Sequence, residues 1–146
     1  MYRVQNASVR GFSIIELAAV IAVMSILAIT ALPAFVSQDE AALTTAAQTL
    51  AGDLRLSRMS AVWGGSSRSV ILTAGTGLYV YDSANGAGKT RDLAEIQRGI
   101  AVGTQSVISF NSLGESGPDT AAITLSLNGL SRTVTVSPFT ARTYVR

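Results

Sequence analysis

The sequence contains neither cysteine nor histidine. Without cysteine the chain can form no disulfide and no thiolate metal site. Without histidine it lacks the commonest catalytic base and metal ligand, so Ser-His-Asp and Cys-His arrangements are excluded. The acidic residues of the second half show no spacing typical of a metal-binding loop. The sequence therefore predicts a protein that is not an enzyme, with no cofactor and no metal site.

Charged residues are scarce as well. They make up 14% of the 146 residues, the net charge is +2, and Lys89 is the only lysine. This balance is too weak to indicate nucleic-acid binding by itself. The segment around this lysine, Gly86-Ala87-Gly88-Lys89-Thr90, superficially resembles a phosphate-binding loop, but it lacks the first glycine at the required spacing. We interpret it as a flexible turn.

What the sequence does contain is a long uncharged run. Twenty residues from Leu17 to Val36 carry no formal charge, and as a helix they are enough to cross a bilayer core of about 30 Å. Arg3 and Arg10 precede the run, which places the N-terminus in the cytoplasm by the positive-inside rule. A cleaved signal peptide or a plain signal anchor would also contain such a run, but neither explains Glu16.

Glu16 stands directly before the uncharged run. An ionised carboxylate in lipid costs roughly 2.5–3.5 kcal/mol or more, so an acid at this position is expected to have a partner. The surrounding segment resembles the type III signal of type IV pilins and type II secretion pseudopilins: Arg10-Gly11-Phe12-Ser13-Ile14-Ile15-Glu16-Leu17. The resemblance implies that a prepilin peptidase cuts between Gly11 and Phe12 and methylates the new amine of Phe12. It also implies that Glu16 is the glutamate of that family.

The carboxylate of Glu16 then has a physical role in assembly. Cleavage creates an ammonium group on Phe12 inside an apolar helical bundle, and the resemblance implies that the carboxylate of one subunit meets the amine of a neighbour. Two buried opposite charges roughly offset each other's desolvation, so such a pair sets subunit register more than stability. Pairing of Glu16 with the amine of its own chain is the alternative in the free subunit.

The chain after Val36 is expected to continue as an amphipathic helix. Apolar residues recur with the period of one helix face: Leu43, Ala47, Leu50, Leu54 and Ala61. Charged residues are expected largely off this stripe: Asp39, Glu40, Asp53, Arg55 and Arg58. The pattern predicts one helix from about Ser13 to Val62, ended by Gly64-Gly65. Pro33 lies inside it and predicts a kink or local loosening, with a tolerated membrane-helix proline as the alternative.

The remaining residues predict short strands joined by turns. The expected strands are 69–73, 78–81, 100–102, 107–110, 122–127 and 132–137. The first two are expected to pair across Gly75-Thr76-Gly77, and the next two are expected to pair with each other. Alternation of apolar and polar residues over 122–127 indicates a half-buried strand. Asn128-Gly129 predicts a type I′ hairpin into the last strand.

Two further stretches resemble the GspH/FimT group of minor pilins. They are the helix segment 47–62, and the segment 107–114 with the hairpin that ends at Ser137. That group often ends its last strand with a glycine-arginine pair, where this chain has Ala141-Arg142. The resemblance implies an α+β, type IV pilin-like fold with a long N-terminal helix packed on an antiparallel β-sheet head. The expected parts are a leader, a transmembrane half of the helix, an amphipathic half, and a β-rich head, at 1–11, 12–36, 37–63 and 64–146.

The same resemblance implies a structural role. We expect a minor pseudopilin of a type II secretion system, held in the inner membrane by a single span with its head in the periplasm, and assembled into a periplasmic filament. The expected partners are prepilin peptidase, other pilin or pseudopilin subunits, the inner-membrane assembly platform, and a secretion substrate or the secretin. A minor pilin that primes a type IV pilus is the alternative.

A DNA-binding role is a further alternative, and it concerns the end of the chain. If this end is extended, Arg142, Tyr144 and Arg146 share one face, with Arg132 nearby in the sequence. Guanidinium groups beside an aromatic ring are suited to hold phosphate and to stack on a base. Some minor pilins of the FimT kind bind DNA through a basic carboxyl end during uptake. An edge strand that arginines protect against pairing is the competing interpretation.

Overall fold

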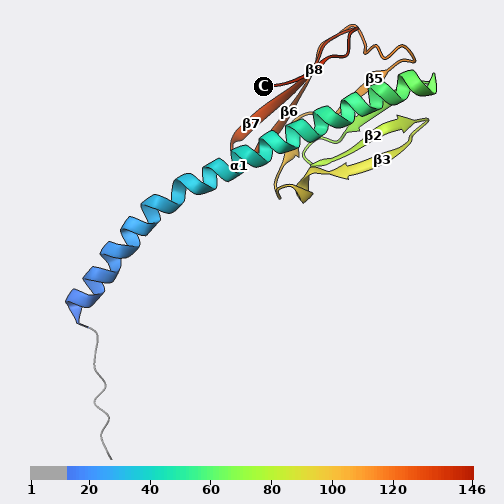
Figure 1. Ribbon diagram of the computed structural model, residues 1–146. Coiled ribbons are helices and arrows are strands. Elements are labelled where there is room, and N and C mark those ends of the chain that lie inside the picture. Colours follow the sequence, from blue (N-terminus) through green and yellow to red (C-terminus); the bar gives the residue numbers. More distant parts are fainter. Residues whose placement is uncertain (1–12) are drawn as a thin grey trace, which may run out of the picture. The chain divides into compact units, whose positions relative to one another are not determined.

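The computed structural model describes residues 13–146, except for the side chains of residues 29–37 (Figure 1). The chain divides into two compact units, Met1–Val36 and Ser37–Arg146, and each is described by itself. Helix α1 has the bounds Ile14–Gly64 and thus contributes residues to both units. Of the first unit, residues 1–12 lie outside the described residues, so the predicted leader and cleavage site are outside them as well.

The C-terminal end of α1 follows from its two glycines, as the sequence predicted. Gly65 adopts a positive φ of 58°, which glycine reaches without the steric cost that a Cβ imposes. The amide of Gly65 donates to the carbonyl of Val62 at 3.4 Å, and the amide of Ser66 donates to that of Ala61 at 3.3 Å. This pair of bonds is the Schellman motif, and it satisfies carbonyl groups that the end of a helix would otherwise leave unpaired.

In the first unit, the described part of α1 is apolar on every side. Its large apolar side chains are all exposed, among them Ile14 at 88% and Met24 at 67%. Among the residues that the structure describes, no helix is long and apolar enough to cross a membrane. The predicted kink at Pro33 falls where side chains lie outside the described residues, so it stays a prediction.

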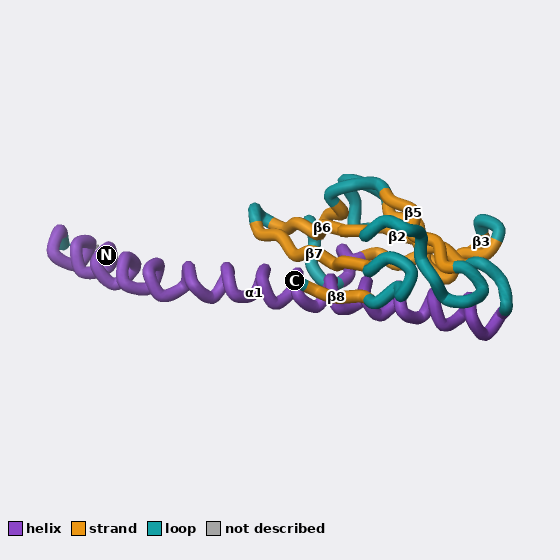
Figure 2. Tube along the Cα trace, turned by 90° about the horizontal axis from the view of Figure 1, so that it is seen from above, coloured by secondary structure: helices purple, strands orange, loops and turns teal. Residues whose placement is uncertain are grey.

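The second unit combines α1 with two antiparallel sheets (Figures 1 and 2). The first sheet has the order β3-β2-β1-β5, with β1 Arg68–Leu72, β2 Leu78–Ala84, β3 Ala87–Asp92 and β5 Ser106–Phe110. The second has the order β4-β6-β7-β8, with β4 Ala101–Val102, β6 Ala121–Leu127, β7 Leu130–Val136 and β8 Thr143–Val145. A short 3-10 helix, η1 Leu93–Glu95, follows β3. The α+β class is therefore as predicted, and the division of the strands into two sheets was not anticipated.

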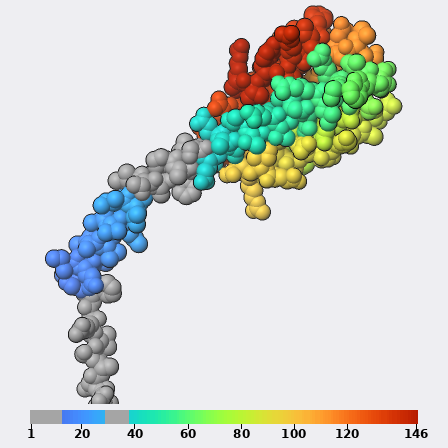
Figure 3. All heavy atoms as spheres, in the orientation of Figure 1, coloured from blue at the N-terminus to red at the C-terminus, as the bar shows by residue number. Residues whose placement is uncertain are grey.

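One helix face closes the core of both sheets. The five predicted apolar positions of α1 are all buried, with exposed fractions of 1% or less: Leu43, Ala47, Leu50, Leu54 and Ala61. They share a single cluster with buried residues of the first sheet, such as Phe110, and of the second, such as Leu125. Full burial of each leucine contributes about 2 kcal/mol. On the face that Figure 3 shows, the helix lies between strands of the two sheets.

Two predicted hairpins are confirmed. β1 and β2 pair antiparallel, with Leu72 opposite Tyr79 across the glycine-containing turn. β6 and β7 pair in full register across Asn128-Gly129, from Leu127 opposite Leu130 onward. Asn128 and Gly129 have φ values of 48° and 83°. Two consecutive residues with positive φ are what a type I′ turn requires.

The predicted pairing of 100–102 with 107–110 is wrong. β4 pairs with β6, and β5 pairs with β1 in the other sheet. The amide of Gly103 donates to the carbonyl of Thr124 at 2.8 Å, so the chain remains bound to the second sheet beyond the end of β4. β5 instead pairs with β1, and its residues Ile108 and Phe110 are buried in the core cluster that they share with α1. The short separation of the two segments in sequence favoured a hairpin between them, but β4 and β5 belong to different sheets.

The interpretation of 86–90 as a flexible turn is also wrong, because most of it belongs to β3. Asn85 and Gly86 have positive φ values of 52° and 84° and connect β2 to β3, with Ala84 opposite Ala87. Gly88 lies against β2 so closely that a Cβ there would come within 2.7 Å of Val80 and 2.8 Å of the Tyr81 carbonyl. The glycines therefore serve a tight hairpin and close strand packing.

Candidate functional site

Glu16 is the charged group of the described part of the first unit. It lies in the first turn of α1, where its amide donates to the carbonyl of Ser13 at 3.0 Å. The positive end of the helix dipole favours a carboxylate at this position. The side chain is exposed amid exposed apolar neighbours such as Ile15 and Val20. Gly11 and Phe12, the residues predicted to be processed, lie outside the described residues.

A buried charge cluster joins α1 to the first sheet. Asp53 is only 6% exposed. Its Oδ2 accepts hydrogen bonds at 2.6 Å from the Tyr79 hydroxyl and at 2.6 Å from Arg91 Nε, and its Oδ1 accepts one at 3.2 Å from Arg91 Nη2. The guanidinium of Arg91 also lies over the ring of Tyr81, 5.2 Å from its centroid. Every acceptor position of the buried carboxylate that faces the sheet thus has a donor.

The prediction that Asp53 lies off the buried stripe is wrong. The buried face of α1 is wider than five apolar positions, since Ser57, one turn after Asp53, is buried too. Ser57 Oγ accepts a hydrogen bond from the amide of Asp82 at 2.8 Å. Polar side chains on this face are accommodated because strands β2 and β3 supply partners. The apolar residues alone underestimate the width of the buried helix face. The donors that pair with its polar side chains lie on distant strands and give no local sequence signal.

Asp39 and Glu40 lie at the N-terminal end of the part of α1 that packs on the sheets, and both contact the head. Asp39 accepts hydrogen bonds from Gln97 at 3.2 Å and from Asn128 at 2.8 Å. Glu40 forms an ion pair with Arg132, with 2.7 Å between Oε1 and Nη2. These exposed and half-exposed contacts join the helix to the loop after η1, to the β6–β7 hairpin and to β7. Both acids therefore hold the head on α1.

The structure does not bring Arg132 together with the other predicted tail residues. Arg132 lies opposite Leu125, which is fully buried, and so projects from the face of the second sheet that α1 covers. Tyr144 lies opposite Thr135, and Arg146 exchanges two hydrogen bonds of 2.9 Å with Thr133. Since residues directly opposite each other share a face, Tyr144 and Arg146 project from the outer face.

The outer face of the second sheet therefore carries three of the four predicted residues. Arg142, Tyr144 and Arg146 are all exposed. In the described parts of the chain, ion pairs involve Arg68, Arg91 and Arg132. Neither Arg142 nor Arg146 has such a partner among those residues. The predicted sharing of one face by these three side chains holds, whereas their binding to DNA stays a prediction.

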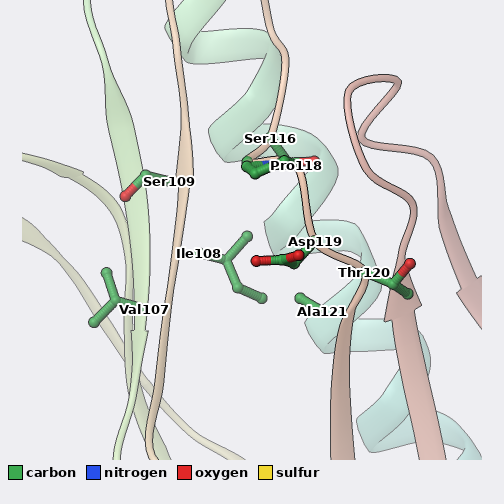
Figure 4. Close-up of a pocket in the computed structure, with 9 residues that line it drawn as sticks. Val107, Ile108, Ser109, Ser116, Pro118, Asp119, Thr120 and Ala121 are labelled. Carbon is green, nitrogen blue, oxygen red and sulfur yellow. The ribbon is translucent and has the colours of Figure 1, made fainter.

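A shallow cavity lies between β5 and the loop that leads into β6 (Figure 4). Its volume is about 280 Å³, and its lining includes Ile108, Ser116, Asp119 and Ala121. Ile108 extends toward the side of Asp119 and Ala121, whereas Val107 and Ser109 project from the other side of the strand (Figure 4). Asp119 is an exposed acid without a second titratable group in this lining. The cavity offers no reactive pair of side chains.

Comparisons with known proteins agree with this architecture. A family model described as type II transport protein GspH matches residues 46–140, roughly two thirds of the chain. Two crystal structures of the type IV minor pilin FimU from Pseudomonas aeruginosa (strain PAO1) are similar in fold, each with 17% sequence identity. The first covers 77% of this chain and 92% of that chain with a TM-score of 0.59, and the second covers 71% and 92% with a TM-score of 0.56. No curated protein sequence matches this chain.

Replacement of Asp53 tests the buried cluster. Asp53→Asn leaves Arg91 without its counter-ion and weakens the bond to Tyr79, and we expect the free energy of unfolding to fall by about 2–3 kcal/mol. Glu40→Gln, which removes the exposed ion pair with Arg132, is the matched control and is expected to cost less than about 1 kcal/mol. Urea unfolding of the three proteins measures both values. Equal losses in the two variants would contradict the assignment.

The pH dependence of stability tests the hydrogen bond of Tyr79. Burial and the bond to the Asp53 carboxylate raise the pKa of Tyr79 well above its ordinary value of about 10. Above pH 10 the unfolded chain therefore binds fewer protons than the folded one, and stability falls as pH rises. Tyr79→Phe is expected to make this decline shallower, by up to about 1.4 kcal/mol per pH unit at the alkaline end. If the stability of Tyr79→Phe and that of the native chain fall in parallel from pH 9.5 to 11, the predicted effect of the Tyr79 hydrogen bond is refuted.

Proposed function

Since this chain belongs to the GspH family of type II transport proteins, we propose that it is a structural, non-enzymatic subunit of a type II secretion filament. In this proposal it is a minor pseudopilin, anchored in the inner membrane by residues 12–36 with its head in the periplasm. Prepilin peptidase cleaves between Gly11 and Phe12 and methylates Phe12. The processed subunit then enters a periplasmic filament.

The observation that supports this role most strongly is the all-round apolar surface of the described first part of α1. Exposed side chains such as Ile14, Val23 and Met24 lie on every side of the helix. A helix that is apolar all round is stable only inside a membrane or among other apolar helices. A membrane-anchored subunit that later enters a helical bundle has both environments in turn. Glu16, the acid of the described part of this helix, then needs a charged partner there.

The head and the second half of α1 together form one rigid body. Its core is closed by the helix itself, and the contacts of Asp39, Glu40 and Asp53 fix the helix against both sheets. Such a head keeps its shape when the first half of the helix exchanges lipid for neighbouring helices. Partners consistent with this role are the other pseudopilins, the inner-membrane assembly platform, and a secreted protein or the secretin at the filament end.

Replacement of Glu16 tests the proposed assembly. In Glu16→Val the amine of a neighbouring Phe12 loses its counter-charge, so incorporation into filaments is expected to fall by about tenfold or more. Ser25→Val is the matched control, because it also makes the apolar segment more apolar but removes no charge. Immunoblots of sheared filaments, compared with the membrane pool, measure incorporation. Equal incorporation of Glu16→Val and the native chain would overturn the proposal.

A second function, DNA uptake as part of a type IV pilus, is favoured by one observation. Arg142 and Arg146 lie beside Tyr144 on the outer face of the second sheet, and neither forms an ion pair with any residue that the structure describes. Guanidinium groups on such a face are suited to phosphates, and the tyrosine ring is suited to stacking on a base. Arg132 does not share this face, because it projects toward α1 and pairs with Glu40.

Gel shifts of labelled duplex DNA by the full chain in mild detergent test this second function. If DNA is bound, affinity falls with rising salt, and Arg142→Ala with Arg146→Ala reduces it by about tenfold or more. Arg98→Ala, at an exposed arginine of the loop before β4, is the control and is expected to have little effect. Absence of a shift at low salt, or a shift unchanged in the double variant, excludes DNA uptake through these residues.

A further inference from the structure

β8 is the free edge of the second sheet. It pairs with β7 on one side, and it is the last strand in the order β4-β6-β7-β8. Thr133 and Arg146 exchange two hydrogen bonds of 2.9 Å, and the amide of Ser137 donates to the carbonyl of Arg142 at 2.8 Å. In an antiparallel pair the bonded positions alternate. Arg142, Tyr144 and Arg146 are therefore bonded to β7, and Thr143 and Val145 direct their backbone groups away from it.

A groove runs along this free edge. Its volume is about 550 Å³, and it is lined by Gln48, Ala51 and Arg55 of α1 and by the three residues of β8. Arg55 Nη2 donates to the carbonyl of Thr143 at 3.0 Å, which holds the guanidinium at the groove. The Thr143 amide and both backbone groups of Val145 then face the open side. Unpaired groups at a strand edge are a template for another extended chain.

The charge at this groove is positive. Arg55 lines the groove, and Arg142 and Arg146 lie next to it on the outer face of the sheet. None of the three belongs to an ion pair among residues 13–28 and 38–146. A guanidinium has five N–H donors, and the Thr143 carbonyl is the acceptor with which Arg55 bonds. The remaining donors of Arg55 suit a carboxylate in bidentate geometry. Acidic side chains on an incoming chain would therefore find partners at the groove.

We propose that an extended, acidic segment of a partner protein binds along β8 and adds a fifth strand to the second sheet. Its backbone pairs with Thr143 and Val145, and its carboxylates pair with Arg55 and Arg146. A peptide backbone suits this edge better than a phosphate backbone does, because the carbonyl of Val145 needs a donor and phosphate oxygens only accept hydrogen bonds. The inference goes beyond the proposed function, since it does not depend on which filament holds the subunit.

Binding of a synthetic peptide tests this proposal. The probe is a short fluorescein-labelled peptide in which pairs of glutamates alternate with pairs of valines, so that carboxylates project from both faces of the bound strand. Its fluorescence anisotropy is measured with the full chain in mild detergent. We expect saturable binding at low salt and slower hydrogen exchange at the Val145 amide in the complex. A peptide with the same charge, N-methylated at every residue, cannot donate to the strand edge and is expected not to bind.

Variants of the groove separate this contact from general attraction between charges. Arg55→Ala with Arg146→Ala is expected to weaken peptide binding by about tenfold or more, and Arg98→Ala is expected to leave it unchanged. Arg146→Ala alone, which leaves the Arg55–Thr143 bond in place, is expected to give a smaller loss and guards against misfolding of the double variant. Equal binding of the N-methylated peptide, equal loss with Arg98→Ala, or binding of duplex DNA but not of the peptide would each overturn the proposal.

Discussion

The structure of the head depends on a single helix face that closes two separate sheets at once. Leu50 and Leu54 of α1 have no exposed surface, and they share one cluster with Phe110 of the first sheet and Leu125 of the second. Neither sheet would bury its apolar side without this helix, because each has only four strands and one covering partner. The charged contacts of the helix follow from the same constraint, since any polar side chain on the covered face needs a partner from a strand. Asp53 meets this need through Tyr79 and Arg91.

The two parts of α1 thus differ in how their apolar side chains are covered. In the head, the helix presents a buried stripe to the sheets and charged side chains beside it, so packing and ion pairs fix its position. In the first unit, the described residues expose apolar side chains all round, with Glu16 as the one acid among them. In the proposed role, the head stays folded while the first part of the helix takes its stability from lipid or from neighbouring helices. The chain belongs to the GspH family of type II transport proteins, and the filament subunit proposed above uses both parts of the helix.

The errors of prediction have specific physical causes. Asn85-Gly86 carries the same hairpin signal as Asn128-Gly129, and it connects β2 to β3, which the sequence interpretation as a flexible turn missed. The pairing of β4 with β6 had no such signal, because it depends on which apolar face each strand covers after the chain has folded. The burial of Asp53 was equally hidden, since its partners come 26 and 38 positions later in the sequence. Local turn chemistry is visible in a sequence, whereas the choice of a distant partner is not.

The sequence by itself determined the helix and its glycine end, the apolar stripe, two hairpins and the α+β class, because each rests on spacing or on residues that permit positive φ. It also marked Glu16 as exceptional, because one acid beside a long apolar run is unusual wherever the run is buried. Only the tertiary structure decided that the strands form two sheets, that Asp53 lies in the core, and that Arg132 faces away from Tyr144 and Arg146. These outcomes depend on which of several possible partners a side chain or strand meets, and that choice is made by burial of the whole apolar surface, not by any local segment.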